Sequence, residues 1–211
     1  MLTASHSRPV TDDVMALLDL FPKKAADALR EPFRAIDLVQ YQNFLKMMYY
    51  YTLDSENKLQ FAADRSDTEE LRDYYLQMKK EETRHYLLAQ ADYEAFGGTI
   101  DTNFKPDVVQ AFDDFWYSLG QSDAAEFAAA LYVFESIASL LREDIKETLL
   151  RLGVIGKQSR WLRVHVQADE EHGAEAREIC ATYNSRHPQA MLAAAQGAVD
   201  KWVAVFQDSI A

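Results

Sequence analysis

Cysteine, glycine and proline are all scarce in this sequence of 211 residues. The single cysteine, Cys180, can form no internal disulfide and excludes the thiolate clusters that hold structural zinc. Seven glycines and five prolines leave long stretches without helix breakers, which favours helix throughout. No apolar run approaches the ~18 residues of a membrane span, and the first ten residues lack the basic and then apolar pattern of a secretory signal. We therefore expect a cytoplasmic protein with no membrane partner.

Positive charge is also in short supply, because 22 Lys and Arg residues face 34 Asp and Glu residues, for a net charge of -12. A nucleic-acid-binding protein needs a basic surface, so the composition argues against this class. Hydrophobic residues make up 48% of the chain, enough to bury a substantial core. The length fits one domain covering residues 1–211.

The apolar periodicity, helix starts and glycine stops predict an all-α, single-domain helical bundle with short connections. Thr11–Asp13, Pro32, the pair Asp67 and Glu70, and Ser159 are typical of helix starts. No segment predicts a convincing strand. The expected helices cover a short segment before Phe21-Pro22 and then about 32–61, 67–97, 106–120, 122–152, 159–183 and the residues after His187-Pro188.

The segment 159–183 contains a triplet that can bind a metal. His165, Asp169 and His172 are spaced i, i+4 and i+7, which places all three side chains on one face of a helix. Two imidazoles and a carboxylate suit a borderline divalent metal such as iron or zinc. The alternative is a solvated, charge-rich helix face, since Glu170 and Glu171 are acidic as well.

The segment 67–97 offers a second pair of ligands. Glu82 and His85 are three residues apart and share a helix face, which is a ligand pair that iron sites in helical bundles use. Glu81 lies four residues before His85 and is an alternative donor. An incidental histidine on a surface helix would give the same pattern.

Glu135 is unusual because its neighbours are nearly all apolar, from Ala128 to Leu141. An ionised carboxylate in such a helix needs a partner, and a divalent cation would keep it charged. A neutral Glu bonded to a core tyrosine is the alternative. Together the candidates are Glu82, His85, Glu135, His165, Asp169 and His172. This inventory suits two metals that share bridging carboxylates and keep positions open for dioxygen and substrate.

In this order and spacing the candidate ligands resemble the haem-oxygenase-like diiron oxidases and oxygenases, which are often described as iron-containing redox enzymes. The resemblance spans residues 40–180 and is carried by Glu82-x2-His85, Glu135 in Tyr-Val-Phe-Glu, and His165-x3-Asp169-x2-His172. Weaker support comes from Tyr50-Tyr51-Thr52 and from Asp92–Gly97.

The resemblance implies two Fe(II) ions per chain and dioxygen as co-substrate. One ion would be held by Glu82, His85 and His165, and the other by Glu135, Asp169 and His172, with a carboxylate bridging them. The pattern looks closest to members that make terminal alkenes from fatty acids or fragment amino acids. A small organic acid is therefore the expected substrate, with C–C cleavage or decarboxylation as the outcome.

Other relatives on this fold match less well. Members that form para-aminobenzoate space the first Glu and His seven apart, and Met78 occupies that position here. Haem oxygenases ligate haem through a histidine near the N-terminus, for which His6 is a poor candidate. Thiaminase-type relatives use a catalytic cysteine, and Cys180 follows the metal triplet, which offers that chemistry little support.

Two other functions remain open from the sequence: a non-catalytic helical protein that binds iron, manganese or a small ligand, and a bundle with a purely structural polar core. The apolar content of the last helix is compatible with a homodimer. Tyr132 is a candidate to contact a metal ligand, because it lies one turn before Glu135. Arg84, Arg160 and Arg163 are candidates to bind a substrate carboxylate.

Overall fold

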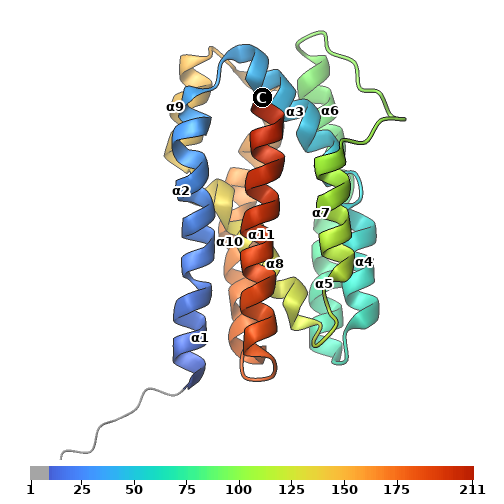
Figure 1. Ribbon diagram of the computed structural model, residues 1–211. Helices are drawn as coiled ribbons and strands as arrows, with labels where there is room; N and C mark the ends of the chain where they lie inside the picture. Colours follow the sequence, from blue (N-terminus) through green and yellow to red (C-terminus); the bar gives the residue numbers. More distant parts are fainter. Residues whose placement is uncertain (1–9) are drawn as a thin grey trace, which may run out of the picture.

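The computed structural model describes residues 10–211, and every regular element in this range is a helix, as expected. The elements are α1 (Val10–Leu18), α2 (Leu20–Ala35), α3 (Leu38–Thr52), α4 (Ser55–Arg65), α5 (Glu69–Glu81), α6 (Tyr86–Glu94), α7 (Asp107–Ser118), α8 (Ala125–Leu140), α9 (Arg142–Arg151), the short 3-10 helix η1 (Gly156–Gln158), α10 (Arg160–Tyr183) and α11 (Pro188–Ile210). In Figure 1, α1 and α2 form one side, α4 to α7 the other, and α8, α10 and α11 lie between them.

Helix α8 is the centre of the bundle and packs against α10, α11 and α2. Most of its side chains are buried, as expected for a helix that is hydrophobic on all sides. Gly173 lets α10 approach α8 closely: a Cβ added there would lie 2.7 Å from Ser136 Oγ and 3.1 Å from the Glu135 carbonyl oxygen. The two helices that carry candidate ligands therefore meet at the level of Glu135 and His172.

The prediction that Pro32 opens a long helix is wrong. Pro32 lies near the end of α2, and the next helix begins at Leu38. There Asp37 Oδ1 accepts the Gln40 N–H at 2.8 Å, and Gln40 Oε1 accepts the Asp37 N–H at 3.0 Å. This reciprocal capping box satisfies two backbone donors that a proline cannot, so it sets the helix start.

The capping residue of α5 also differs from the prediction. Thr68, and not Asp67, caps the helix by accepting the Leu71 N–H at 3.3 Å, while Asp67 forms an ion pair with Arg186. The α8 start agrees better, since Asp123 Oδ1 accepts the Ala125 N–H at 2.8 Å.

Three predicted long helices are each interrupted in the structure. The segment 32–61 breaks between α3 and α4, the segment 67–97 breaks between α5 and α6, and the segment 122–152 breaks at Leu141. Neither glycine nor proline occurs at these breaks. Composition therefore could not reveal them, and tertiary contacts decide where the chain turns.

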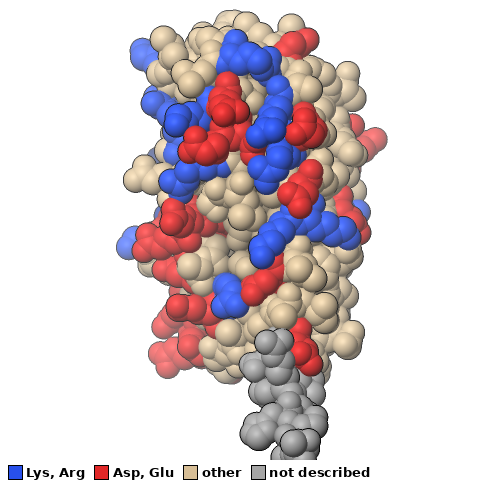
Figure 2. Space-filling model, turned by 90° about the vertical axis from the view of Figure 1, so that its left-hand side faces the viewer, with Lys and Arg blue, Asp and Glu red and all other residues tan. Residues whose placement is uncertain are grey.

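Charged side chains of both signs cover the face formed by the left-hand side of Figure 1, and Figure 2 shows them interspersed in its upper half. Two ion pairs join α2 to α9: buried Asp144 of α9 pairs with Arg30 at 2.5 Å and with Arg34 at 2.6 Å, both on α2. None of the helices within residues 10–211 has both the length and the apolar character that crossing a bilayer requires.

Candidate metal centre

The triplet of α10 faces the interior. Asp169 and His172 are buried, His165 is partly buried, and α10 packs against α8 along this region. The alternative of a solvated charged face therefore does not apply to these three residues, whereas Glu170 and Glu171 are exposed as that alternative requires.

Trp161 fixes the orientation of His165. The Nδ1 atom of His165 lies 2.7 Å from the Trp161 carbonyl oxygen, and the two rings stack with centroids 4.0 Å apart. Because a carbonyl only accepts, Nδ1 carries the proton and Nε2 keeps its lone pair for a ligand. Asp92 of α6 holds the start of α10 in turn, because its Oδ2 accepts the Trp161 N–H at 2.8 Å. Ser159 occupies the predicted cap position, but its side chain makes no capping hydrogen bond.

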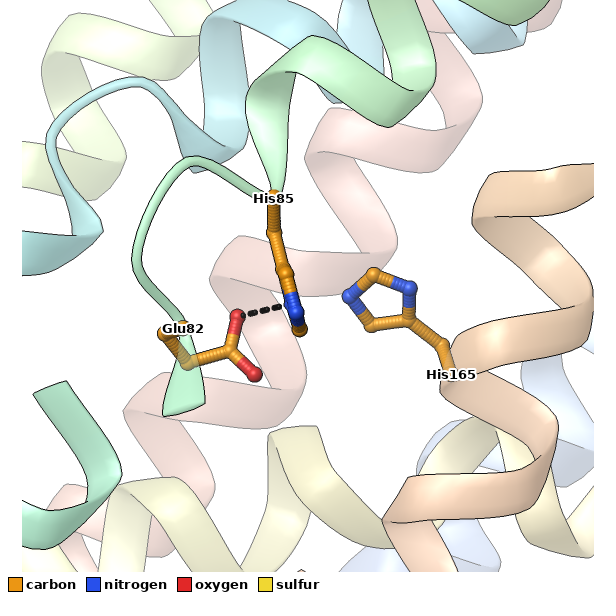
Figure 3. A group of neighbouring side chains, drawn as sticks. All are labelled: Glu82, His85 and His165. Atoms are coloured by element: carbon orange, nitrogen blue, oxygen red, sulfur yellow. Dashed lines mark ion pairs between the residues drawn. The ribbon is translucent and has the colours of Figure 1, made fainter. Parts of the chain in front are cut away.

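Glu82 and His85 come together at the break between α5 and α6, and not on a continuous helix. Arg84 adopts a φ of 63°, a left-handed conformation that is uncommon for a residue other than glycine. The turn brings His85 Nδ1 to 2.8 Å from Glu82 Oε2, and the His165 ring lies beside them, 5.2 Å from the His85 ring between centroids (Figure 3). The structure thus brings the predicted pair together, but at a turn between two helices and not on one helix face.

Glu135 reaches the same region from α8. Its Oε2 lies 3.3 Å from His172 Nδ1, and the carboxylate lines the same cavity as Glu82 and Asp169. The alternative of a Glu bonded to a core tyrosine is not observed. Tyr132 instead donates its hydroxyl proton to Asp19 at 2.9 Å.

Two groups of ligand atoms overlap at this point. One atom from each of Glu82, His85 and His165 lies within 4.8 Å of the others, and the same holds for Glu82, Glu135 and His172. The first group equals the set implied for one ion, whereas the second contains Glu82 where the resemblance implied Asp169. Glu82 belongs to both groups, which is the position of a bridging carboxylate.

Asp169 and Glu81 lie beside these groups. Asp169 lines the cavity next to Glu135 and His165, and its Oδ1 is buried without a hydrogen-bond partner. Glu81, the alternative donor from the sequence, approaches His172 and not His85: its Oε2 lies 3.1 Å from His172 Nε2. His172 therefore has a carboxylate on each ring nitrogen.

Burial and the neighbouring charges both shift the pKa values of the carboxyl groups. Burial raises the pKa of Glu135, and burial with the nearby Glu135 and Glu82 charges raises the pKa of Asp169 well above its usual range. Burial acts on Glu82 in the same direction, but the hydrogen bond with His85 and the attraction of His165 outweigh it and lower the pKa of Glu82. Glu82, Glu135 and Asp169 thus lie close together, and few positive charges are near enough to stabilise their ionised forms.

The histidines differ in the same environment. The hydrogen bond with Glu135 raises the pKa of His172 to about 9, whereas burial lowers the pKa of His165 to about 4. For His85, burial acts to lower the pKa, but the hydrogen bond with Glu82 outweighs it and the pKa rises. His165 is therefore neutral at pH 7, as a metal ligand must be.

This donor set fits iron. Nitrogen and carboxylate oxygen ligands without thiolates suit Fe(II) or Mn(II), and the two overlapping groups can hold two ions. The unpartnered Asp169 Oδ1 is a further oxygen donor that a cation would satisfy. In the absence of a cation, burying this many carboxyl groups together is unfavourable.

A cavity of about 100 Å³ opens beside the carboxylates. Its walls are mainly aliphatic and aromatic, and they come from α2, α3, α4, α7, α8, α9, α10 and α11. Tyr51 lines it, while Tyr49 and Tyr50 are buried in the core.

The proposed carboxylate-binding arginines do not line this cavity. Arg84 and Arg163 are exposed, and Arg160 lies 3.4 Å from Asp92 through its Nε. The sequence reasoning missed Lys58, a buried lysine that does line the cavity. Leu59 and Phe61 follow Lys58, but Glu56 and Asn57 precede it, so the local sequence does not indicate its burial. His6 lies outside the described residues.

Comparison with known proteins identifies the family of this chain. The chain belongs to the iron-containing redox enzyme family, which it matches over residues 42–202. A search of curated proteins by sequence finds no match.

Two solved structures share the fold. A domain of unknown function with a heme oxygenase-like fold from Shewanella denitrificans has a TM-score of 0.77 and 13% identity, covering 95% of this chain and 90% of that one. A TenA homolog from Pseudomonas syringae has a TM-score of 0.76 and 14% identity, covering 94% of this chain and 91% of that one. The expected haem-oxygenase-like fold is confirmed.

Proposed function

We propose that this protein is an Fe(II)- and dioxygen-dependent oxidoreductase that uses two iron ions to oxidise a small organic acid. The observation that carries the proposal is the pair of overlapping ligand groups that share Glu82. Membership of an iron-containing redox enzyme family supports iron as the metal and redox chemistry as the activity. Two ions, dioxygen and the organic acid are our extension of these facts.

Glu82, His85 and His165 would hold one ion, and Glu135, His172 and Asp169 the other, with Glu82 able to bridge. Bound iron would supply electrons and open coordination positions for dioxygen activation. The chain's own residues orient the ligands: Trp161 holds the tautomer of His165 through its carbonyl oxygen. The apolar cavity keeps water from the side of the site where a substrate would lie.

The test measures iron binding first and dioxygen reactivity second. Anaerobic titration of the metal-free protein with Fe(II) should reach about two ions per chain, as the two ligand groups require. Addition of dioxygen should then give a transient visible absorption and measurable dioxygen consumption. His172→Ala should abolish both, whereas His187→Ala, at an exposed histidine, should leave both unchanged.

A non-catalytic metal-binding protein is the alternative, and the same ligand groups support it equally well. Stable binding of iron without dioxygen consumption, in the presence of a panel of short organic acids, would favour this alternative. A chain that binds no iron would overturn both functions.

A further inference from the structure

Lys58 of α4 is a buried cation on the wall of the cavity. Its side chain is 5% exposed, and its Nζ lies 2.5 Å from Asp113 Oδ1 and 4.6 Å from the centroid of the Phe112 ring, another cavity wall. Burial lowers the pKa of Lys58, and the attraction of Asp113 opposes this change. Placing an ammonium group in such surroundings is unfavourable unless its hydrogen-bonding capacity is used.

The charges in contact with Lys58 do not balance. Asp113 also pairs with Lys105 through its other oxygen, so two ammonium groups share one carboxylate. Asp54 lies near enough to favour the charged form of Lys58, but its oxygens already accept hydrogen bonds from Tyr117 and Asn57. The Lys58–Asp113–Lys105 cluster thus carries one net positive charge, and Lys58 is its buried cation because the Lys105 side chain is 41% exposed.

The ammonium group of Lys58 also has N–H donors that its contacts with the protein do not fully use. It carries three N–H groups, and besides Asp113 its remaining contact is a long one, 3.4 Å to the Tyr51 carbonyl oxygen. Ser55, one turn earlier on α4, lines the same cavity. An anion in the cavity would find donors on both side chains.

The cavity therefore has two polar regions joined by apolar walls. One is the carboxylate–histidine cluster, and the other is the wall with Lys58 and Ser55. Tyr51 lines the same cavity, and burial together with the charges of Glu135 and Asp113 raises the pKa of its hydroxyl. A ligand with an anionic head and a short apolar body matches this arrangement.

We propose that Lys58 binds the carboxylate of the substrate and so selects a short organic acid whose body extends toward the metal centre. A cavity of about 100 Å³ is smaller than the roughly 150 Å³ that accommodates benzene in an apolar protein core. The body of the acid is thus a few carbon atoms long. This proposal rests on the proposed function for the chemistry, but the binding step itself needs no iron.

Intrinsic fluorescence can test it, because all three tryptophans of the protein, Trp116, Trp161 and Trp202, line the cavity. The full chain, without metal, is titrated with butyrate and, in parallel, with 1-butanol. Butyrate should bind more tightly than 1-butanol. Lys58→Met should weaken butyrate binding by about tenfold or more, since a charge-assisted hydrogen bond is lost, and should leave 1-butanol binding unchanged.

Two controls separate binding from folding. Lys146→Met removes an exposed lysine elsewhere and should change neither affinity. Lys58→Met combined with Asp113→Asn removes the carboxylate that the single variant leaves buried, and it should show the same loss of butyrate preference.

Equal affinity of the wild-type chain for butyrate and 1-butanol would overturn the proposal, whatever the variants do. Butyrate binding that requires Fe(II) and does not depend on Lys58 would also overturn it, because the carboxylate would then bind the metal. Failure of the proposed function is distinguishable: the chain would bind no iron or consume no dioxygen, yet still select butyrate through Lys58.

Discussion

Trp161 shows how much one residue can contribute to this site. Its backbone N–H donates to Asp92, and its backbone carbonyl oxygen accepts from His165 Nδ1. Its ring stacks on the same histidine and lines the cavity. The position of a candidate metal ligand is thus determined by a residue outside the candidate ligand set. Outer contacts of this kind orient the ligands of metal sites, and their loss typically costs about 10- to 100-fold in metal affinity or activity.

Cys180 is a residue whose environment excludes reactivity. It is fully buried on α10, burial raises the pKa of its thiol, and it does not line the cavity. We expect no reaction with Ellman's reagent in the native protein and one reactive thiol per chain in denaturant. Cys180→Ala should cost about 1 kcal/mol of stability and retain iron binding and dioxygen consumption. Loss of activity in a folded Cys180→Ala protein would indicate thiol chemistry instead.

At the scale of helices, the close approach of α8 and α10 determines the site. Gly173→Ala would place a Cβ 2.7 Å from Ser136 Oγ and 3.1 Å from the Glu135 carbonyl oxygen. The strain should cost about 1–3 kcal/mol, which exceeds the gain of about 1 kcal/mol in helix propensity. Displacement of Glu135 should also weaken iron binding in an anaerobic titration.

Ala174 provides the matched control, because it follows Gly173 and is exposed. Ala174→Gly should cost about 1 kcal/mol through helix propensity alone and leave the iron affinity unchanged. If Gly173→Ala bound iron as the wild-type protein does, the packing of α8 against α10 would not control the site.

The sequence predicts helix content and the triplet of α10 well, because periodicity and spacing are local properties. The break at residues 82–85 could not be predicted, since the left-handed Arg84 is not signalled by glycine. Lys58 was missed for another reason. A lysine in a helix indicates solvent exposure unless a distant residue buries it, and Asp113 lies 55 positions further along the chain.

At the scale of the whole molecule, the candidate metal centre joins three parts of the chain: the α5–α6 turn, α8 and α10. Iron that binds the folded chain only should therefore stabilise the entire bundle. At a free Fe(II) concentration 100-fold above the Kd, the gain is about 2.7 kcal/mol. For a chain of this size that is an increase of roughly 5–10 °C in Tm, measurable anaerobically by circular dichroism.

Asp169→Asn separates two effects of this carboxyl group: its effect on the stability of the metal-free protein and its contribution to metal binding. Asp169 is a buried carboxyl group with an unpartnered oxygen and acidic neighbours. The metal-free variant should unfold at the same temperature as the wild-type protein or a higher one, because the cost of burying an ionisable carboxyl group beside other acidic groups is removed. Its increase in Tm with Fe(II) should be smaller. An unchanged increase would show that Asp169 is not a ligand.

The multiple contacts of Trp161 constrain how this protein can evolve. A substitution there would alter the shape of the cavity, the start of α10 and the orientation of the His165 ring at once. A new substrate preference would therefore come with a loss of metal affinity. Leu29 and Ile145 line the same cavity from helices that carry no candidate ligand. Divergence in substrate range is therefore expected at these walls, while the residue at position 161 stays aromatic.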